Sequence, residues 1–513
     1  MRRHFSLVPT TAVFLGLALA VTGCSPIESP SGGGNGASRG PDLRPVKPGG
    51  ELRVALSAEP DLLDPTLART LVGRTVFNAI CEKLYDVDQS LNIVPQLASA
   101  LPVFSEDNTT ATIKIRTGLK FADGTTMDAA AVKASLDRHK NLSGSARTSE
   151  LSSVDTVEVV DPATVLLRLK TPFAPLSAVL ADRAGMVMTP AAVTAAADKF
   201  AQNPVCIGPF KFSSRIAQDR IEVVKDPNYY NAANVKLDKV IYRIIADGTT
   251  RFNNLRSGDV EVLDAVNATD VDALKADTNL TLLTSDSLGY QGITINVGNV
   301  NGVGKPAGRL AAPFAGPMAT SNKVRQAFEL SLDRDAINKA VFRGQFTPAC
   351  GPISPTSPLS SEIAQKCPVH DPAAAKAMLT AAGVAAPVRV SMVIGNTPQA
   401  RLLGEAIQAQ AREGGFEIQL QPTEFSASLD ATDAGKYQMF QIGWSGRVDP
   451  DGNIANFLQT NGSQNISGYA NPLVDRTIDR GRASGDIPSR KQLYGDLVTK
   501  IHEDAPIIYL YRQ

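Results

Sequence analysis

The chain has 513 residues, of which 43% are hydrophobic and 20% charged, and its 51 basic side chains equal its 51 acidic ones. This length exceeds what one hydrophobic core usually organises, so we expect two or three folded units. The balanced charge excludes the broad basic surface that nucleic-acid binding requires.

The N-terminal segment is typical of an exported precursor. MRRH is followed by an apolar run from Phe5 to Val21 and then by TGCSP, which makes residues 1–23 a secretory signal peptide. Pro9 and the short run argue against a spanning helix that stays in the chain. Val21-Thr22-Gly23-Cys24 resembles a bacterial lipobox, which implies cleavage before Cys24 and lipidation of its thiol.

The next segment, residues 24–48, is rich in Gly, Ser and Pro and almost free of bulky apolar groups. It cannot bury enough surface to offset its chain entropy, so we expect a flexible tether. With the lipid on Cys24, the tether would anchor the folded part at a membrane surface while leaving it free to move.

Four cysteines remain beyond Cys24, and an even number in an exported chain favours disulfides. Cys350 and Cys367 enclose a Pro/Ser-rich segment whose closure would restrict a loop, so we predict that they pair. By elimination, Cys81 pairs with Cys206. No C-x-x-C pair supports zinc, and we predict neither a metal nor a cofactor.

From residue 51 onward, strands and helices alternate. The first block shows strand patterns at 51–58, 112–116, 156–161 and 164–170, and helical patterns at 75–86 and from Thr126 onward, the latter capped by Thr or Asp. The second block shows strands at 291–297, 388–395, 416–424, 439–444 and 505–512, with a helix at 398–415. The fold class is therefore α/β with mixed sheets, in more than one lobe.

The most distinctive stretch is QIGWSGRVDPDGN at 441–453, which contains the only tryptophan. Asp449 and Asp451 alternate as in a calcium loop, but Pro450 and the glycine position break the required order, so a capped turn is the better interpretation. His139, His370 and His502 are far apart in sequence and are expected on helical or loop surfaces as solvated or capping residues. With no nucleophile and base pair in view, we predict no catalytic residues.

Segments spread over nearly the whole mature chain resemble the extracytoplasmic solute-binding proteins of peptide and nickel ABC importers. The matching stretches include LDPTLARTLVGRTVFNAICEKLYD, TIKIRTGLKFADGTTMDAAAVKASLDR, CIGPFKF, DPNYY, GDVEVLDAV, QIGWSGRVDPDGN and IHEDAPIIYLY. The resemblance implies a type II periplasmic-binding-protein-like fold that encloses its ligand by hinge closure. Lobe I would be residues 49–287 with a subdomain inserted at about 76–204, lobe II residues 288–502, and residues 503–513 a strand returning to lobe I.

The resemblance also implies partners and a location. A monomeric receptor at the outer face of the bacterial cytoplasmic membrane would deliver its ligand to an importer permease with cytoplasmic ATPases. Two alternative functions remain open. One is a regulatory or scaffolding lipoprotein with the same fold. The other is a secreted enzyme, and the main objection to it is the lack of a paired nucleophile and base.

The candidate ligand contacts come from the same resemblance, and two of them depart from its pattern. The candidates are Thr66, Leu67, Tyr290, Asn396, Trp444, Ser445, Gly446 and Arg447. Arg447 stands where peptide binders carry an acid, and Ile394 and Asn396 stand where dipeptide binders carry arginine and tyrosine. Tyr290 would either line the cleft or pack under the hinge.

The altered anchors leave the ligand open. An arginine repels an ammonium group and favours a carboxylate or phosphate through its planar fork. A peptide held through its backbone remains one alternative. An opine-like acid, a conjugate or a metal chelate is the other.

Overall fold

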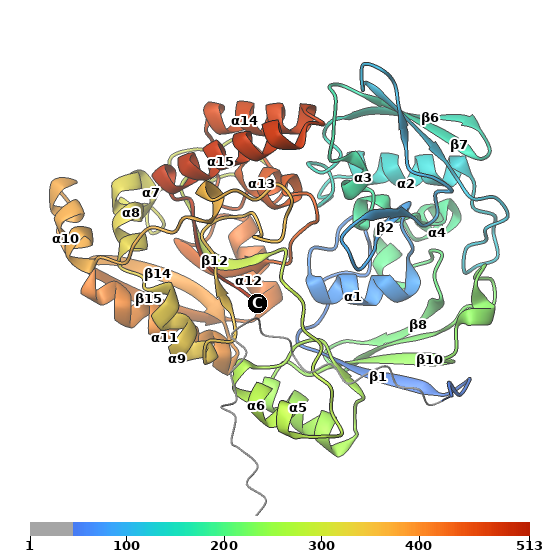
Figure 1. Cartoon of the computed structure of the whole chain (residues 1–513), viewed down its shortest axis with the longest axis horizontal. Coiled ribbons are helices and arrows are strands. Elements are labelled where there is room, and N and C mark those ends of the chain that lie inside the picture. The colour runs from blue at the N-terminus through green and yellow to red at the C-terminus, as the bar shows by residue number, and fades with distance from the viewer. Residues whose placement is uncertain (1–44) are drawn as a thin grey trace, which may run out of the picture.

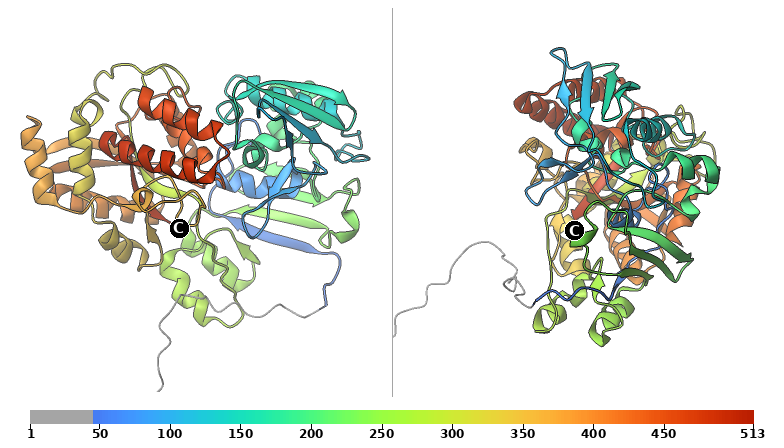
Figure 2. Two further views of the ribbon diagram at one scale, coloured as in Figure 1. Left: turned by 45° about the horizontal axis from the view of Figure 1, so that its top comes forward. Right: turned by 90° about the vertical axis from the view of Figure 1, so that its right-hand side faces the viewer.

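The computed structural model describes residues 45–513, except for the side chains of residues 195–198. The predicted signal peptide, Cys24 and most of the tether lie outside these residues. The described chain forms two lobes that lie side by side (Figures 1 and 2). One carries β1 (Glu51–Leu56), β8 (Phe210–Ile216) and β10 (Lys239–Ile244), and the other carries β14 (Val388–Gly395) and β15 (Phe416–Thr423). Within residues 45–513, every helix falls short of the combined length and hydrophobicity that crossing a bilayer demands.

Lobe I is built on a five-stranded mixed sheet in the order β11-β1-β10-β9-β8. Its strands are β1 (Glu51–Leu56), β8 (Phe210–Ile216), β9 (Arg220–Lys225), β10 (Lys239–Ile244) and β11 (Val262–Leu263). β1 runs parallel to both of its neighbours, β11 and β10, whereas β9 is antiparallel to β8 and β10. The helices of this part are α1 (Leu71–Ile80), α5 (Gly248–Ser257) and α6 (Val271–Ala276).

A separate subdomain lies in the chain between β1 and β8 and has its own apolar core. Its four-stranded antiparallel sheet has the order β4-β5-β7-β6, and β2 pairs with β3 beside it. The strands are β2 (Tyr85–Val87), β3 (Ile93–Pro95), β4 (Val103–Phe104), β5 (Thr110–Lys114), β6 (Val154–Asp161) and β7 (Thr164–Leu169). The helices of the subdomain are α2 (Ala129–Asn141) and α3 (Leu176–Val179), whereas α4 (Pro190–Ala196) packs against the core of lobe I.

Lobe II contains a six-stranded mixed sheet in the order β13-β17-β12-β16-β14-β15. Its strands are β12 (Tyr290–Ile295), β13 (Thr347–Pro348), β14 (Val388–Gly395), β15 (Phe416–Thr423), β16 (Met439–Trp444) and β17 (Ile507–Arg512). Its helices are α7 (Pro317–Thr320), α8 (Asn322–Leu330), α9 (Arg334–Phe342), α10 (Pro372–Ala381), α11 (Pro398–Glu413), α12 (Phe425–Asp433), α13 (Asp451–Leu458), α14 (Pro472–Ala483) and α15 (Ile487–Asp504). Strands β14 and β15 are parallel, because the helical crossover through α11 returns the chain to the end of the sheet at which β14 begins.

The C-terminal strand corrects one expectation. β17 lies between β12 and β13 in the sheet of lobe II, antiparallel to both, so the predicted return to lobe I is wrong. All six residues of β17 are buried. An apolar strand covered on both faces belongs in the centre of a sheet, and lobe II offers that place.

Two cysteine pairs lie at bonding distance and match the predicted pairing. The Cys81 and Cys206 sulfurs are 2.00 Å apart and join the end of α1 to the segment before β8. The Cys350 and Cys367 sulfurs are 1.89 Å apart and close a loop of lobe II. Each pair therefore lies within one lobe and leaves the two lobes free to move against each other.

Candidate functional site

The site begins where β16 ends and the chain turns into α13. Gly446 has φ +82°, and a Cβ there would lie 2.3 Å from the backbone carbon of Leu288. Both the left-handed conformation and this close approach require glycine. The turn thereby brings the residues on either side of Gly446 to the face of lobe II that meets lobe I.

Asn453 on α13 holds Trp444 and Arg447 together. Its Oδ1 accepts from the indole Nε1 of Trp444 at 2.9 Å and from the backbone N–H of Arg447 at 2.7 Å. The Arg447 guanidinium carbon lies 4.2 Å from the indole ring centroid, a cation–π contact. The aromatic ring and the cation are thus positioned as one unit.

The two aspartates of the same motif have structural partners. Asp449 accepts from the backbone N–H of Asp451 at 2.9 Å, which forms the turn at the start of α13. Asp449 also pairs with Arg490 and Asp451 with Arg482, each at 2.7 Å. The capped-turn interpretation is confirmed.

Arg447 extends from lobe II into a buried polar patch of lobe I. Its Nε lies 2.6 Å from Asp182 Oδ2 and its Nη2 lies 3.6 Å from Glu150 Oε1. Only 9% of the Arg447 side chain is exposed. The cation therefore already faces two carboxylates of the opposite lobe.

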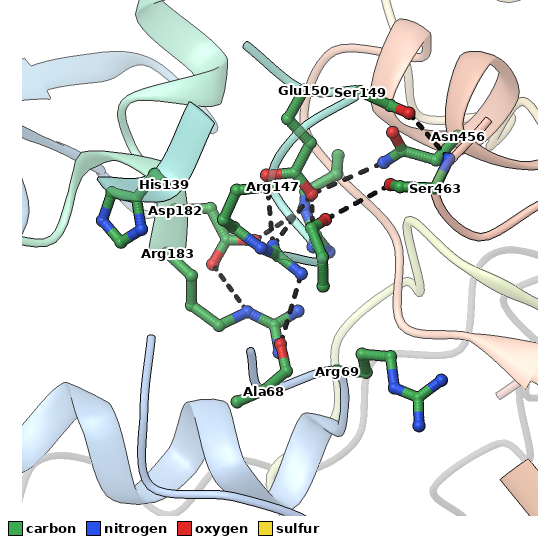
Figure 3. A network of polar contacts seen from close by, with 12 residues as sticks. Ala68, Arg69, His139, Arg147, Ser149, Glu150, Asp182, Arg183, Asn456 and Ser463 are labelled. Carbon is green, nitrogen blue, oxygen red and sulfur yellow. Dashed lines mark hydrogen bonds and ion pairs between the residues drawn. The ribbon is translucent and has the colours of Figure 1, made fainter. Parts of the chain in front are cut away.

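Three further arginines of lobe I share this patch. Arg74 on α1 donates to Ser445 Oγ at 3.1 Å and lies 3.4 Å from Asp182. Arg147 donates to Glu150 at 2.8 Å and to the carbonyl of Ala68 at 3.2 Å. Figure 3 shows Arg147 with Glu150 and Ala68.

Arg183 completes the set. It donates through one nitrogen to the carbonyls of Ala68 and Thr70, at 3.1 and 3.2 Å, while its Nε faces Asp182 at 3.9 Å (Figure 3). Both Arg147 and Arg183 are fully buried. We call Arg74, Arg147, Arg183 and Arg447, with Asp182 and Glu150, the interlobe arginine cluster.

Mutual repulsion and burial dominate the electrostatics of the cluster. Burial alone would raise the pKa of Asp182, but the fields of Arg447, Arg74, Arg183 and Arg147 outweigh it and hold that pKa well below its usual range. Burial and the field of Arg147 lower the pKa of Arg183, and burial lowers the pKa of Arg74 to about 10. The charged guanidinium groups therefore carry a cost that additional negative charge would relieve.

Other polar contacts join the two lobes around the cluster. The backbone N–H of Ser463 donates to Ser149 Oγ at 2.7 Å, and Asn456 donates to Glu150 at 3.4 Å (Figure 3). Arg69 forms an ion pair with Asp433 at the edge of this region. The two lobes therefore contact each other through charged and hydrogen-bonded groups, so the structure has its lobes in a closed arrangement.

The structure brings four of the predicted contacts to this interface. Trp444, Ser445, Gly446 and Arg447 all lie at the turn described above. Thr66 is buried inside lobe I, where its hydroxyl contacts His139 and Arg138. Leu67 is half-buried beside it, and the carbonyls that reach the cluster belong to Ala68 and Thr70 instead.

Tyr290 and Asn396 lie elsewhere. Tyr290 is 4% exposed, pairs with Trp444 across β12 and β16, and packs edge-on against Tyr509. Asn396 is exposed in the turn between β14 and α11. Among residues 45–513, no polar contact between the lobes involves Asn396.

His139 corrects the expectation that the histidines lie on helical or loop surfaces. It is fully buried, with Nδ1 2.9 Å from Thr66 Oγ1 and Nε2 3.0 Å from the carbonyl of Met186. Burial, reinforced by the charge of Arg147, lowers its pKa to about 4 despite the opposing hydrogen bond to Met186. It is a neutral structural residue behind the cluster.

Sequence reasoning missed the lobe I half of the cluster. Arg147 and Glu150 are spaced i,i+3 in a polar loop that carries no motif, and Asp182-Arg183 interrupts the apolar run AVLADRAGMVM. The second feature was a usable signal, because charges inside an apolar run are costly unless they are paired or functional. The geometry as a whole defines a class: a two-lobed binding protein whose lobes close over a polar interface.

Comparison with known proteins specifies the class further. The profile of the bacterial extracellular solute-binding proteins, family 5, matches residues 92–465. The glutathione-binding protein GsiB of Pectobacterium atrosepticum is 30% identical over 462 residues, which cover 87% of this chain and 86% of that protein. The chain therefore belongs to the family 5 solute-binding proteins.

Solved structures agree with this membership. The binding protein AgaA of A. tumefaciens R10, in complex with agropinic acid, superimposes with a TM-score of 0.80 at 29% identity, over 90% of this chain and 91% of that one. DppA of Helicobacter pylori, in complex with the peptide STSA, also gives 0.80, at 23% identity, over 91% and 93% of the two chains. The expected type II periplasmic-binding-protein fold is confirmed, and the protein is an extracytoplasmic binding protein rather than an enzyme.

Proposed function

We propose that this protein captures peptides or peptide-like solutes between its lobes and delivers them to the permease of an ABC importer. The observation that carries the proposal is the interlobe contact set itself, in which Arg447 of lobe II reaches Asp182 and Glu150 of lobe I. Groups that meet only when the lobes close are suited to sensing a ligand between them, and closure is the signal that a permease can read.

Three similar proteins frame the ligand class. Their names state that they bind glutathione, agropinic acid and the peptide STSA. These are small polar solutes with carboxylate groups, which agrees with Arg447 as a contact for an anionic group. An opine-like acid or another acidic conjugate is the second candidate, and the arginines at the interface favour it.

The proposal includes a lipid anchor on Cys24, exposure at the outer face of the cytoplasmic membrane, a monomeric state and two disulfides formed after export. The tether of residues 24–48 would let the folded part reach the permease. When residues 1–23 are replaced by a secretory signal peptide that is cleaved without a lipobox, Cys24→Ser should move the protein from the membrane fraction to the soluble fraction of the export host. Retention of that variant in the membrane fraction would refute the anchor without touching the binding proposal.

The decisive experiment identifies the ligand. The mature protein is purified under native conditions, unfolded, and the released small molecules are analysed by mass spectrometry. Arg447→Ala should then weaken binding of the released solute by about tenfold or more, as loss of a charge-assisted hydrogen bond predicts. An unchanged affinity would remove Arg447 from the site, and chemical conversion of the solute would overturn the receptor role.

A further inference from the structure

The interlobe arginine cluster has more positive than negative charge. It brings four guanidinium groups together with two carboxylates, which leaves an excess of two positive charges. The neighbouring group at its edge, Arg69 with Asp61 and Asp433, has the opposite excess of one. The sum over both groups remains positive, in a region where burial makes unbalanced charge costly.

The cluster also has unused hydrogen-bond donors. Five guanidinium nitrogens have no hydrogen-bond partner among the described residues. Three of them, Nε of Arg74, Nε of Arg183 and Nη2 of Arg447, lie 3.4, 3.9 and 3.6 Å from a carboxylate oxygen of the cluster. The other two are Nε of Arg147 and Nη2 of Arg183. Two of these side chains, Arg147 and Arg183, are completely buried. Buried donors are normally satisfied, so each of these is a place where an acceptor oxygen would be stabilised.

The negative groups, by contrast, are already engaged. Asp182 faces Arg447, Arg74 and Arg183, and Glu150 accepts from Arg147 and Asn456. Asp182 Oδ2 has no hydrogen-bond partner among the described residues, but it lies 2.6 Å from Arg447 Nε, so the ammonium group of a peptide would have to compete with a guanidinium group there. The cluster is therefore suited to acceptors and unsuited to cations.

From these observations we infer that the interlobe arginine cluster is an anion receptor that selects solutes with a net negative charge and two or more carboxylate or phosphate groups. The inference rests on the proposed function, because it names the ligand class of the same site. Arg74, Arg147 and Arg183 then determine specificity together with Arg447, from the opposite lobe. A bound anion would supply both the missing charge and the missing acceptors.

The test uses a matched pair of probes and three variants. Calorimetry of the mature protein compares N-acetyl-Asp-Glu with its neutral counterpart N-acetyl-Asn-Gln-amide. The wild type should bind the acidic probe at least about tenfold more tightly. Arg183→Gln should lose about tenfold or more, whereas Glu150→Gln, which removes a competing negative charge, should gain affinity for the acidic probe.

Arg482→Gln is the control, because Arg482 is also a buried arginine at the lobe interface but pairs with Asp451 outside the cluster. It should leave the ratio of acidic to neutral affinity unchanged. A purely structural role for the cluster predicts weaker binding in both Arg183→Gln and Glu150→Gln. If Arg183→Gln fails to fold, the sign of the change in Glu150→Gln decides.

A second arm separates this inference from the proposed function. The protein is incubated with an equimolar pool of acidic, neutral and basic peptides of two to five residues together with N-acetylated acidic dipeptides, and the bound fraction is read by mass spectrometry. Enrichment of net-negative members supports the inference. Retention of neutral or basic peptides overturns it while the receptor role stands, and a folded protein that retains no member of the pool overturns both.

Discussion

His139 offers a test of how burial shapes lobe I. The neutral ring fits its site, because Nε2–H donates to the carbonyl of Met186 and Nδ1 accepts from Thr66. The Thr66 hydroxyl is free to donate since its oxygen already accepts from Arg138. A second proton on the ring would displace the Thr66 hydroxyl proton from this contact and place a positive charge near Arg138 and Arg147 in a fully buried site.

The magnitude follows from the two pKa values. The folded-state pKa of His139 is about 4, against an unfolded value of about 6.5. Well above pH 6.5 the ring is neutral in both states, and the site contributes no pH dependence. As the pH falls, the unfolded chain takes up the proton first, so stability is lost: about 2 kcal/mol between pH 7 and pH 5, and about 3 kcal/mol by pH 4.

The assay is urea unfolding, monitored by circular dichroism, at pH 7, 6 and 5. The change in the free energy of unfolding with pH is compared between the wild type and the variants. Other groups titrate alike in wild type and in His139→Gln and cancel in the difference, so the variant should lack this loss. His370→Gln is the control, because its ring is 33% exposed. Equal pH dependence of wild type and His139→Gln would refute the argument that the ring is held neutral.

Two further predictions concern the scaffold of the site. Gly446→Ala should lower the free energy of unfolding by about 1–3 kcal/mol, because the residue has a positive φ and its new methyl group would meet the backbone at Leu288. The thermal midpoint of the purified variant tests this prediction. An unchanged midpoint would contradict it. Removing the Cys81–Cys206 pair should lower the free energy of unfolding by about 5 kcal/mol, and removing the Cys350–Cys367 pair should lower it by about 3 kcal/mol, because the pairs span 125 and 17 residues. Urea unfolding measures both losses. Equal losses would refute this loop-length reasoning.

The sequence predicted the local elements of lobe II well. VRVSMVIG became β14, PQARLLGEAIQAQAREGG became α11 and MFQIGW became β16, because each has a strong period and a clear boundary residue. Thr397 caps α11 and Pro398 opens it, both readable from the sequence. β17 was placed in the wrong lobe because strand partners depend on topology, which a strand pattern does not encode.

The site was predicted only in part for a similar reason. Trp444 to Arg447 form one contiguous motif between two glycines, and the motif could be recognised. Arg147 and Arg183 come from separate loops of the inserted subdomain, and only the closed arrangement of the lobes brings them to Arg447. His139 was misjudged because a histidine among the charged residues of α2 has the pattern of a solvated position, although the subdomain packs over it.

The distribution of charge between the lobes links recognition to closure. Lobe II contributes one guanidinium group to a patch where lobe I already holds three, so closing without a ligand brings like charges together, and Asp182 and Glu150 offset only part of the repulsion. If the cluster binds an anion as we infer, the anion would lower the free energy of the closed state more than that of the open one. Since a ligand shifts an equilibrium only by its differential affinity for the two states, the charge of the solute, more than its size, would control how completely this receptor closes.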